Sequence, residues 1–94
     1  MTTQFLHVGF SFTGGRSSPT EEIQYILDKG LDWVRYAPNN YILYTAKDVE
    51  VWYNRLRKVI HEDDNIFIVE INIKNRQGWL PSKIWDWIKK DRID

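Results

Sequence analysis

The order of the hydrophobic patterns along this chain limits its fold more than any other feature of the sequence. Leu6, Val8 and Phe10 alternate with other residues, which is the two-residue period of a half-buried strand. Further apolar runs, rich in β-branched and aromatic residues, predict three more strands. The four predicted strands cover residues 4–12, 33–36, 41–44 and 66–73. Helical patterns follow the first and the third of them, so the order is strand, helix, strand, strand, helix, strand.

Both predicted helices carry local start signals. Ser18 is a favourable N-cap, Glu21 completes a capping box, and Gly30 stops the first helix at its C-terminal end. Thr45 is the predicted cap of the second helix, with Asp48 three residues on. Apolar residues recur three and four apart in this helix and form its buried stripe: Val49, Trp52, Tyr53, Leu56, Val59 and Ile60.

This order of elements predicts an α+β domain of ferredoxin-like βαββαβ type. It has an antiparallel four-stranded sheet, two helices on one face and an extra short C-terminal helix. With 94 residues the chain fits one domain, residues 1–94, of which residues 75–94 form a Trp-rich extension. Trp85 and Trp87 cannot both face one side of a short helix. One of them is therefore expected to be exposed or covered by a partner. The two helices leave one face of the sheet open, and we expect this tail or a second copy to cover part of it.

Composition narrows the classes of function. The chain has no cysteine, which excludes disulfides and thiolate metal sites. Its formal net charge is zero, whereas dedicated nucleic-acid-binding proteins usually have a basic excess. The first residues, Met1–Gln4, have no basic and apolar leader pattern, and no apolar run is long enough to cross a bilayer. We expect a cytoplasmic protein without a cofactor or membrane partner.

Three stretches resemble a known group of proteins. They are Val8–Phe12 at the end of the first strand, the hairpin from Trp33–Tyr36 to Tyr41–Tyr44, and Asp63–Val69 leading into the last strand. From Phe5 to Ile73 the chain resembles the small ferredoxin-fold proteins related to the CRISPR adaptation subunit and their SinR-like cousins. The resemblance implies the fold and a homodimer. Members of the group act as metal-dependent nucleases, structural subunits, toxins or antitoxins.

The nuclease members of that group have an aspartate after an aromatic residue near the end of the first strand. Here the aromatic residue is Phe10 and the next residue is Ser11. A hydroxyl is a poorer ligand for a hard cation than a carboxylate. The resemblance therefore argues against a metal site at Ser11, and we predict no metal ligands.

The titratable residues give no catalytic pattern. His7 has no carboxylate or second histidine nearby in the sequence, and His61 falls at a helix C-terminus, where its charge favours the dipole. The acidic turn Glu62–Asp64 lacks the spacing of a calcium-binding loop. The loop Gly14–Ser18 precedes a helix but completes no phosphate-binding fingerprint, which leaves Arg16 as the residue to test for an anion.

Basic and aromatic residues supply the candidate binding surfaces. Arg55, Arg57 and Lys58 form a basic face on the second helix and, with Arg16, are the candidates for nucleic-acid contact. Lys89, Lys90 and Arg92 form a second basic group at the tail. The candidate residues of a protein interface are aromatic: Trp79, Trp85, Trp87, Tyr41 and Tyr44.

The leading prediction is a non-catalytic, homodimeric interaction module in a defence, mobile-element or toxin–antitoxin system. That setting comes from the resemblance alone. A nucleic-acid-binding or nuclease subunit is the first alternative. A phage- or plasmid-encoded inhibitor of a host enzyme is the second, since small size and exposed aromatic residues permit it.

Overall fold

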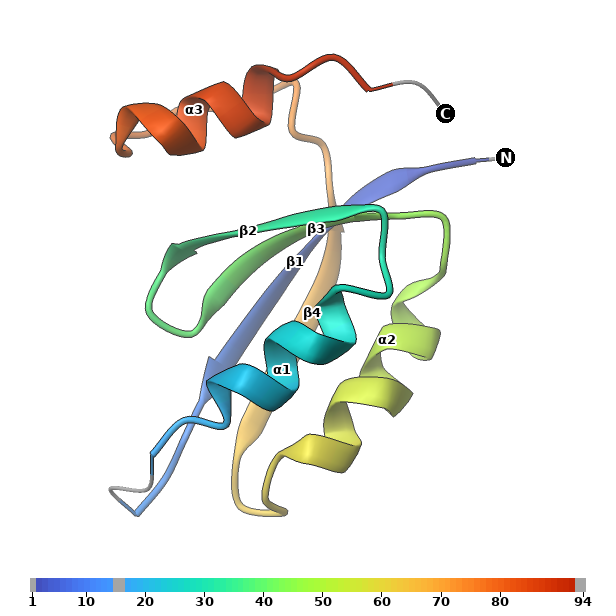
Figure 1. Cartoon of the computed structure of the whole chain (residues 1–94), viewed down its shortest axis with the longest axis vertical. Coiled ribbons are helices and arrows are strands. Elements are labelled where there is room, and N and C mark those ends of the chain that lie inside the picture. The colour runs from blue at the N-terminus through green and yellow to red at the C-terminus, as the bar shows by residue number, and fades with distance from the viewer. Residues whose placement is uncertain (1, 15–16, 93–94) are drawn as a thin grey trace.

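The computed structural model describes residues 2–14 and 17–92, and within them the chain forms an open antiparallel sheet with three α-helices (Figure 1). This confirms the predicted α+β class with a four-stranded antiparallel sheet. In chain order the elements are β1 (Gln4–Ser11), α1 (Thr20–Leu27), β2 (Asp32–Ala37), β3 (Asn40–Thr45), α2 (Val49–Leu56), the 3₁₀ turn η1 (Arg57–Val59), β4 (Asn65–Ile71) and α3 (Ser82–Lys89).

The strands lie in the order β2-β3-β1-β4, so β2 and β4 form the two edges of the sheet. β1 pairs antiparallel with both β3 and β4, and β2 pairs antiparallel with β3. The β2–β3 register shifts between Arg35 and Ala37, which puts Tyr36 in a bulge. Asn39 in the connecting turn has a φ of 63°, a conformation that asparagine adopts more readily than most residues.

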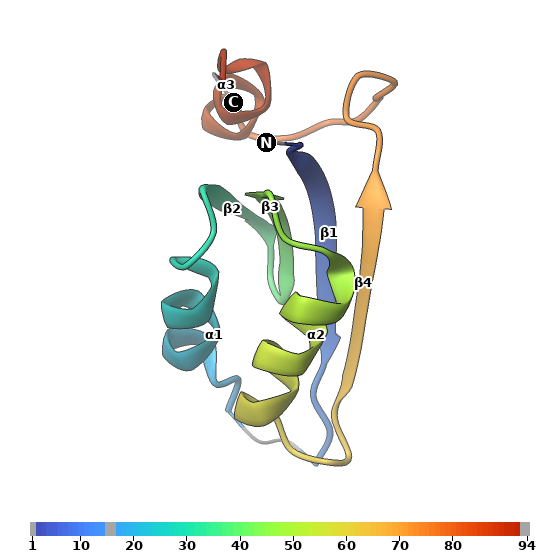
Figure 2. The same ribbon diagram turned by 90° about the vertical axis from the view of Figure 1, so that its right-hand side faces the viewer.

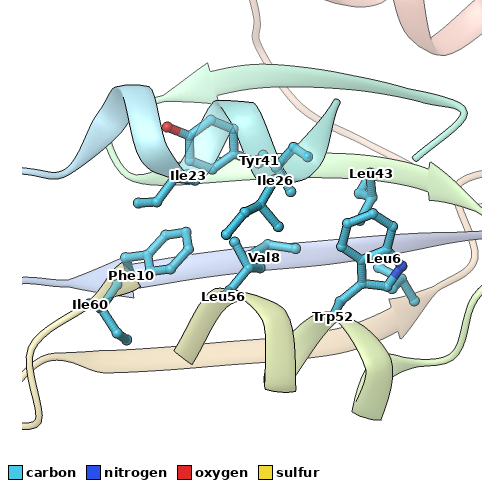
Figure 3. Close-up of a cluster of buried hydrophobic side chains, with 11 residues drawn as sticks. Leu6, Val8, Phe10, Ile23, Ile26, Tyr41, Leu43, Trp52, Leu56 and Ile60 are labelled. Atoms are coloured by element: carbon cyan, nitrogen blue, oxygen red, sulfur yellow. The ribbon is translucent and has the colours of Figure 1, made fainter. Parts of the chain in front are cut away.

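One face of the sheet carries α1 and α2, and the core lies between these helices and the strands (Figures 2 and 3). Leu6, Val8 and Leu43 point from the sheet into this layer, and Trp52 and Leu56 of α2 meet them with fully buried side chains. Burying a tryptophan requires a partner for its N–H group. The Trp52 Nε1 donates to Thr45 Oγ1 at 3.0 Å, so the last residue of β3 supplies the acceptor for this buried indole.

The predicted helix caps were wrong in detail. Ser18 Oγ pairs with Thr20 Oγ1 at 2.9 Å instead of capping α1, and Pro19 occupies the N-cap position with no side-chain bond. Asp48, not Thr45, caps α2, because its carboxylate accepts from the Val49 amide at 2.8 Å. Thr45 Oγ1 instead accepts from Trp52 Nε1 and from the Lys47 amide, each at 3.0 Å. A local sequence pattern does not reveal that Ser18 and Thr45 bond to these other partners.

α1 ends at Leu27 with Asp28 as its C-cap, so the predicted stop at Gly30 was wrong. Gly30 is required for a different reason. Its φ lies outside the left-handed region, unlike that of Gly14 at 69°. A Cβ at Gly30 would lie 2.8 Å from Leu43 Cδ1 and 3.3 Å from Trp52 Cζ2. Close packing of the α1–β2 connection against the core therefore requires glycine here.

The tail turns back over the other face of the sheet. Phe5 and Tyr44 alternate with the core residues Leu6 and Leu43, so they point away from α1 and α2, and α3 lies against this side above β2 (Figure 1). Ile84 and Ile88 are the buried residues of α3. No α-helix in the described ranges is both long and apolar enough to cross a bilayer.

Candidate functional site

Two of the predicted nucleic-acid residues, Arg55 and Arg57, make contacts within the chain. The Arg55 guanidinium lies 4.8 Å from the Trp52 ring, and Arg57 donates to the carbonyls of His61 and Glu62 at 3.3 and 3.5 Å. Both side chains therefore support the end of α2. Lys58 is exposed. Arg16 lies outside the described residues.

The predicted aromatic interface is divided between surface and interior. Tyr41 is 1% exposed and packs in the core, and Tyr44 is 7% exposed beneath the tail. Neither ring is available as a stacking surface in this conformation. Trp87 packs edge-on against Phe5 at 6.0 Å, and Trp85 lies beside Gly78. Trp79 is fully exposed in the loop before α3.

His7 has a partner that the sequence did not indicate. Its Nε2 lies 2.6 Å from the Tyr36 hydroxyl, on the sheet face opposite the core. Burial lowers the pKa of His7 and raises the pKa of Tyr36, so both groups are neutral at pH 7. His7 also lies over Gly9, where a Cβ would meet its Cε1 at 3.2 Å. The pair bridges β1 to the bulge of β2 on the face opposite the core.

The acidic turn has an organising role. Asp64 is buried, and its carboxylate accepts from the His61 amide at 2.8 Å and the Thr13 amide at 3.2 Å. It thereby ties the end of β1 to the turn before β4. Within residues 2–14 and 17–92, no three acidic, histidine or cysteine side chains gather as metal ligands would. Ser11, at the end of β1, is exposed.

β4 leaves exposed apolar side chains at an edge of the sheet. Phe67 is 66% exposed and Val69 is 38% exposed, and both lie on the face opposite α2. Phe67 pairs with Gly9, which has no side chain to cover it. A second apolar surface flanks the same edge on the α2 side, as a shallow hollow of about 350 Å³ lined by Val49, Glu50, Tyr53, Ile66, Phe67 and Ile68.

A larger groove of about 760 Å³ lies between the sheet and the tail. Phe5, Ile71 and Ile88 contribute apolar walls. Its charged lining is mainly basic, with Glu70 and Asp91 opposed by five cationic side chains: Lys74, Arg76, Lys89, Lys90 and Arg92. A local positive excess therefore exists in a chain whose total charge is zero.

Asp32 at the start of β2 anchors this tail. Its carboxylate lies 3.4 Å from Lys90 Nζ and 3.5 Å from Arg92 Nη2. Burial raises the pKa of Asp32, but Trp87, Lys90 and the Trp33 amide lower it by more, so the pKa lies below its ordinary value. Trp87 Nε1 is buried near this carboxylate but makes no hydrogen bond of ordinary geometry to a described residue.

Sequence reasoning missed Asp32 and Phe5 as parts of a site. Asp32 precedes a strand and Phe5 alternates with core residues, so each has a routine local explanation. What marks Asp32 as part of a site is its pairing with Lys90 and Arg92. Asp32 and Lys90 are 58 residues apart in the sequence, and only the fold brings them together. Comparison of the chain with family models, curated proteins and solved structures gives no match.

Proposed function

We propose that this protein is a non-catalytic homodimeric interaction module whose two copies join along the free edge of β4. The observation that carries this proposal is the exposure of Phe67, 66%, on an edge strand with one charged residue, Glu70. Edge strands of monomeric proteins are usually protected by several charges, a proline or a covering segment. No residue in the described part of the chain gives β4 such cover, and apolar surface flanks the strand on both sides.

The charges at the two ends of β4 favour a second copy as the occupant. Glu62 and Asp63 precede the strand, whereas Lys74 and Arg76 follow it. Two copies that pair antiparallel about a two-fold axis bring the acidic end of one beside the basic end of the other. The same pairing places the strip of Phe67, Val69 and Ile71 of one copy beside that of the next, where cross-strand contacts reduce its exposure.

The test is mass in solution by light scattering across a range of concentrations. The unchanged chain should approach the mass of a dimer, and Phe67→Lys should remain a monomer because the pairing would bring two ammonium groups close together within an apolar strip. Leu31→Lys, which changes a 54% exposed apolar residue away from β4, should leave the dimer intact. The proposal of a dimer along β4 would be rejected if the unchanged chain were a monomer, or if Phe67→Lys left the dimer intact.

We further propose the ferredoxin-like arrangement itself. Support comes from the antiparallel order β2-β3-β1-β4, with α1 joining β1 to β2 and α2 joining β3 to β4. Each helix thus connects strands that are not neighbours, which is the split βαβ pattern. Relation to the CRISPR adaptation subunit and a role in a defence or toxin–antitoxin system remain predictions of the resemblance.

Nucleic-acid binding is a second candidate, favoured by the charge of the tail rather than that of α2. Residues 72–92 contain Asp86 and Asp91 against six basic residues: Lys74, Arg76, Lys83, Lys89, Lys90 and Arg92. The basic groove and the exposed Trp79 are features suited to a phosphate backbone and a stacked base.

The two candidate basic faces can be separated by fluorescence anisotropy with a labelled single-stranded oligonucleotide at increasing salt. Lys74→Ala with Arg76→Ala should weaken binding and reduce the salt slope by about 1 to 2. Lys58→Ala on the α2 side is the matched control and should leave binding unchanged. Absence of binding at low salt would remove this candidate without affecting the dimer proposal.

A further inference from the structure

The Arg92 guanidinium is enclosed by aromatic rings from three different elements. It lies 5.2 Å from the Phe5 ring of β1, 5.3 Å from the Tyr44 ring of β3 and 4.2 Å from the Trp87 ring of α3. Asp32 of β2 lies 3.5 Å from its Nη2. The Arg92 side chain is 9% exposed. We call Phe5, Tyr44, Trp87 and Asp32 the aromatic cage.

The walls of the aromatic cage support one another independently of the cation. The Phe5 and Tyr44 rings are 4.9 Å apart and inclined at 41°, and Phe5 meets Trp87 at 6.0 Å and 77°. The three rings therefore face the enclosed charge from different directions. Three aromatic faces with a nearby carboxylate are the arrangement by which proteins recognise quaternary ammonium and methylated lysine groups.

Arg92 fills this space imperfectly. Its Nη2 donates to the Trp87 carbonyl at 2.8 Å and its Nη1 to the Lys90 carbonyl at 3.0 Å. Its Nε, however, is buried and finds no acceptor within the described part of the chain. A buried donor without an acceptor destabilises the arrangement. A quaternary ammonium group carries the same charge but has no N–H donor, so it would leave none unsatisfied.

The surroundings provide a route by which Arg92 can leave. The residue lies beyond the end of α3 at Lys89, and the chain is already extended at Lys90 with a ψ of 131°. Ile84 and Ile88 hold the helix to the sheet without it. Phe5, Tyr44 and Arg92 also line the groove of about 760 Å³, so the aromatic cage borders open space.

We propose that the aromatic cage is a binding site for a quaternary ammonium group, and that Arg92 occupies it as an internal competitor in the free protein. The ligand is a trimethylated lysine side chain or a choline-like group. Binding exchanges one enclosed cation for another. Removing the internal competitor therefore strengthens binding, because the competent state is no longer a small fraction of the population.

The experiment follows the five tryptophan indole N–H resonances by NMR during titration with tetramethylammonium chloride, with sodium chloride as the control for ionic strength. A Trp87→Phe spectrum assigns the Trp87 signal. Arg92→Ala should bind tetramethylammonium about tenfold more tightly than the unchanged chain. Adding Phe5→Leu to Arg92→Ala, which removes a ring but keeps apolar volume, should abolish that binding. Choline and a trimethyl-lysine peptide then distinguish the two sources of ligand.

A purely structural role for Arg92 gives different results. If Arg92→Ala keeps its Trp87 resonance in place and shows no saturable shift beyond the sodium chloride control, the proposal is overturned. If Arg92→Ala releases α3 from the sheet, the test is made instead on the unchanged chain at a high concentration of tetramethylammonium. There the Trp87 resonance must shift while that of the fully exposed Trp79 does not. Equal shifts at both residues would reject the site.

Discussion

The two faces of the sheet are built from the same strands but are covered in different ways. On one face, α1 and α2 enclose Leu6, Val8 and Leu43 together with fully buried Trp52 and Leu56 (Figure 3). On the other, α3 is held by its buried residues Ile84 and Ile88 and by the contacts of Arg92, and the β4 end stays exposed. The first face supplies the stability of the domain. The second carries the surfaces that are available to partners.

The largest expected effect is on the helix-covered face. Trp52→Ala removes a side chain with no exposure and leaves the Thr45 hydroxyl without its indole partner. Urea unfolding should show a loss of about 3–5 kcal/mol. The neighbouring Tyr53→Ala, at 45% exposure, is the control, and its effect should stay below about 1 kcal/mol. Similar losses for both would mean that α2 is not seated by Trp52.

A matched pair of valines compares the two faces directly. Val8 on the covered face is fully buried, whereas Val69 on the other face is 38% exposed. Val8→Thr introduces a hydroxyl into the core and should cost about 1–3 kcal/mol. Val69→Thr should change the free energy of unfolding by less than about 0.5 kcal/mol at concentrations where the chain is monomeric. Equal effects would contradict the assignment of the faces.

A smaller effect is expected at the anchor of the tail. The pKa of Asp32 lies below its ordinary value, so its ionised form stabilises the folded state above about pH 4 and that contribution is lost as the pH falls through the lower folded pKa. Lys90 and Arg92 are the cations that face it. Asp32→Asn should lower stability at pH 7 by about 1 kcal/mol.

The control for this anchor is Asp86→Asn, which changes an exposed carboxylate on α3 itself. It should leave stability at pH 7 unchanged within about 0.5 kcal/mol. The difference between the unchanged chain and Asp32→Asn should shrink when unfolding is repeated at pH 3, because the Asp32 carboxylate of the unfolded chain is then mostly protonated. A difference that stays constant with pH would show that the charge of Asp32 does not hold the tail.

Local periodicity was sufficient to predict the strands and helices but not the contacts between them. The alternation in β1 and the three- and four-residue spacing through Trp52 and Leu56 predicted the strands, the helices and much of the core. The caps failed because Thr45 is recruited by Trp52, a contact between a strand end and a helix. Tyr41 was a candidate interface residue, yet the fold buries it, and the candidate nucleic-acid residue Arg55 packs its guanidinium against the Trp52 ring.

The candidate sites were harder to predict for the same reason. The aromatic cage joins Phe5, Asp32, Tyr44 and Trp87 around Arg92, and no spacing along the chain brings them together. The exposure of Phe67 likewise depends on its pairing with Gly9 and on the position of β4 at the edge. Strand order, rather than residue type, decides which apolar residues remain uncovered.

The proposal of a β4-edge dimer is tested most directly by amide hydrogen exchange at low and high protein concentration, because β2 at the other edge is an internal control. The account predicts that protection of residues 65–71 rises with concentration while that of residues 32–37 does not. Protection that is independent of concentration in β4, or that rises at β2 instead, would contradict it.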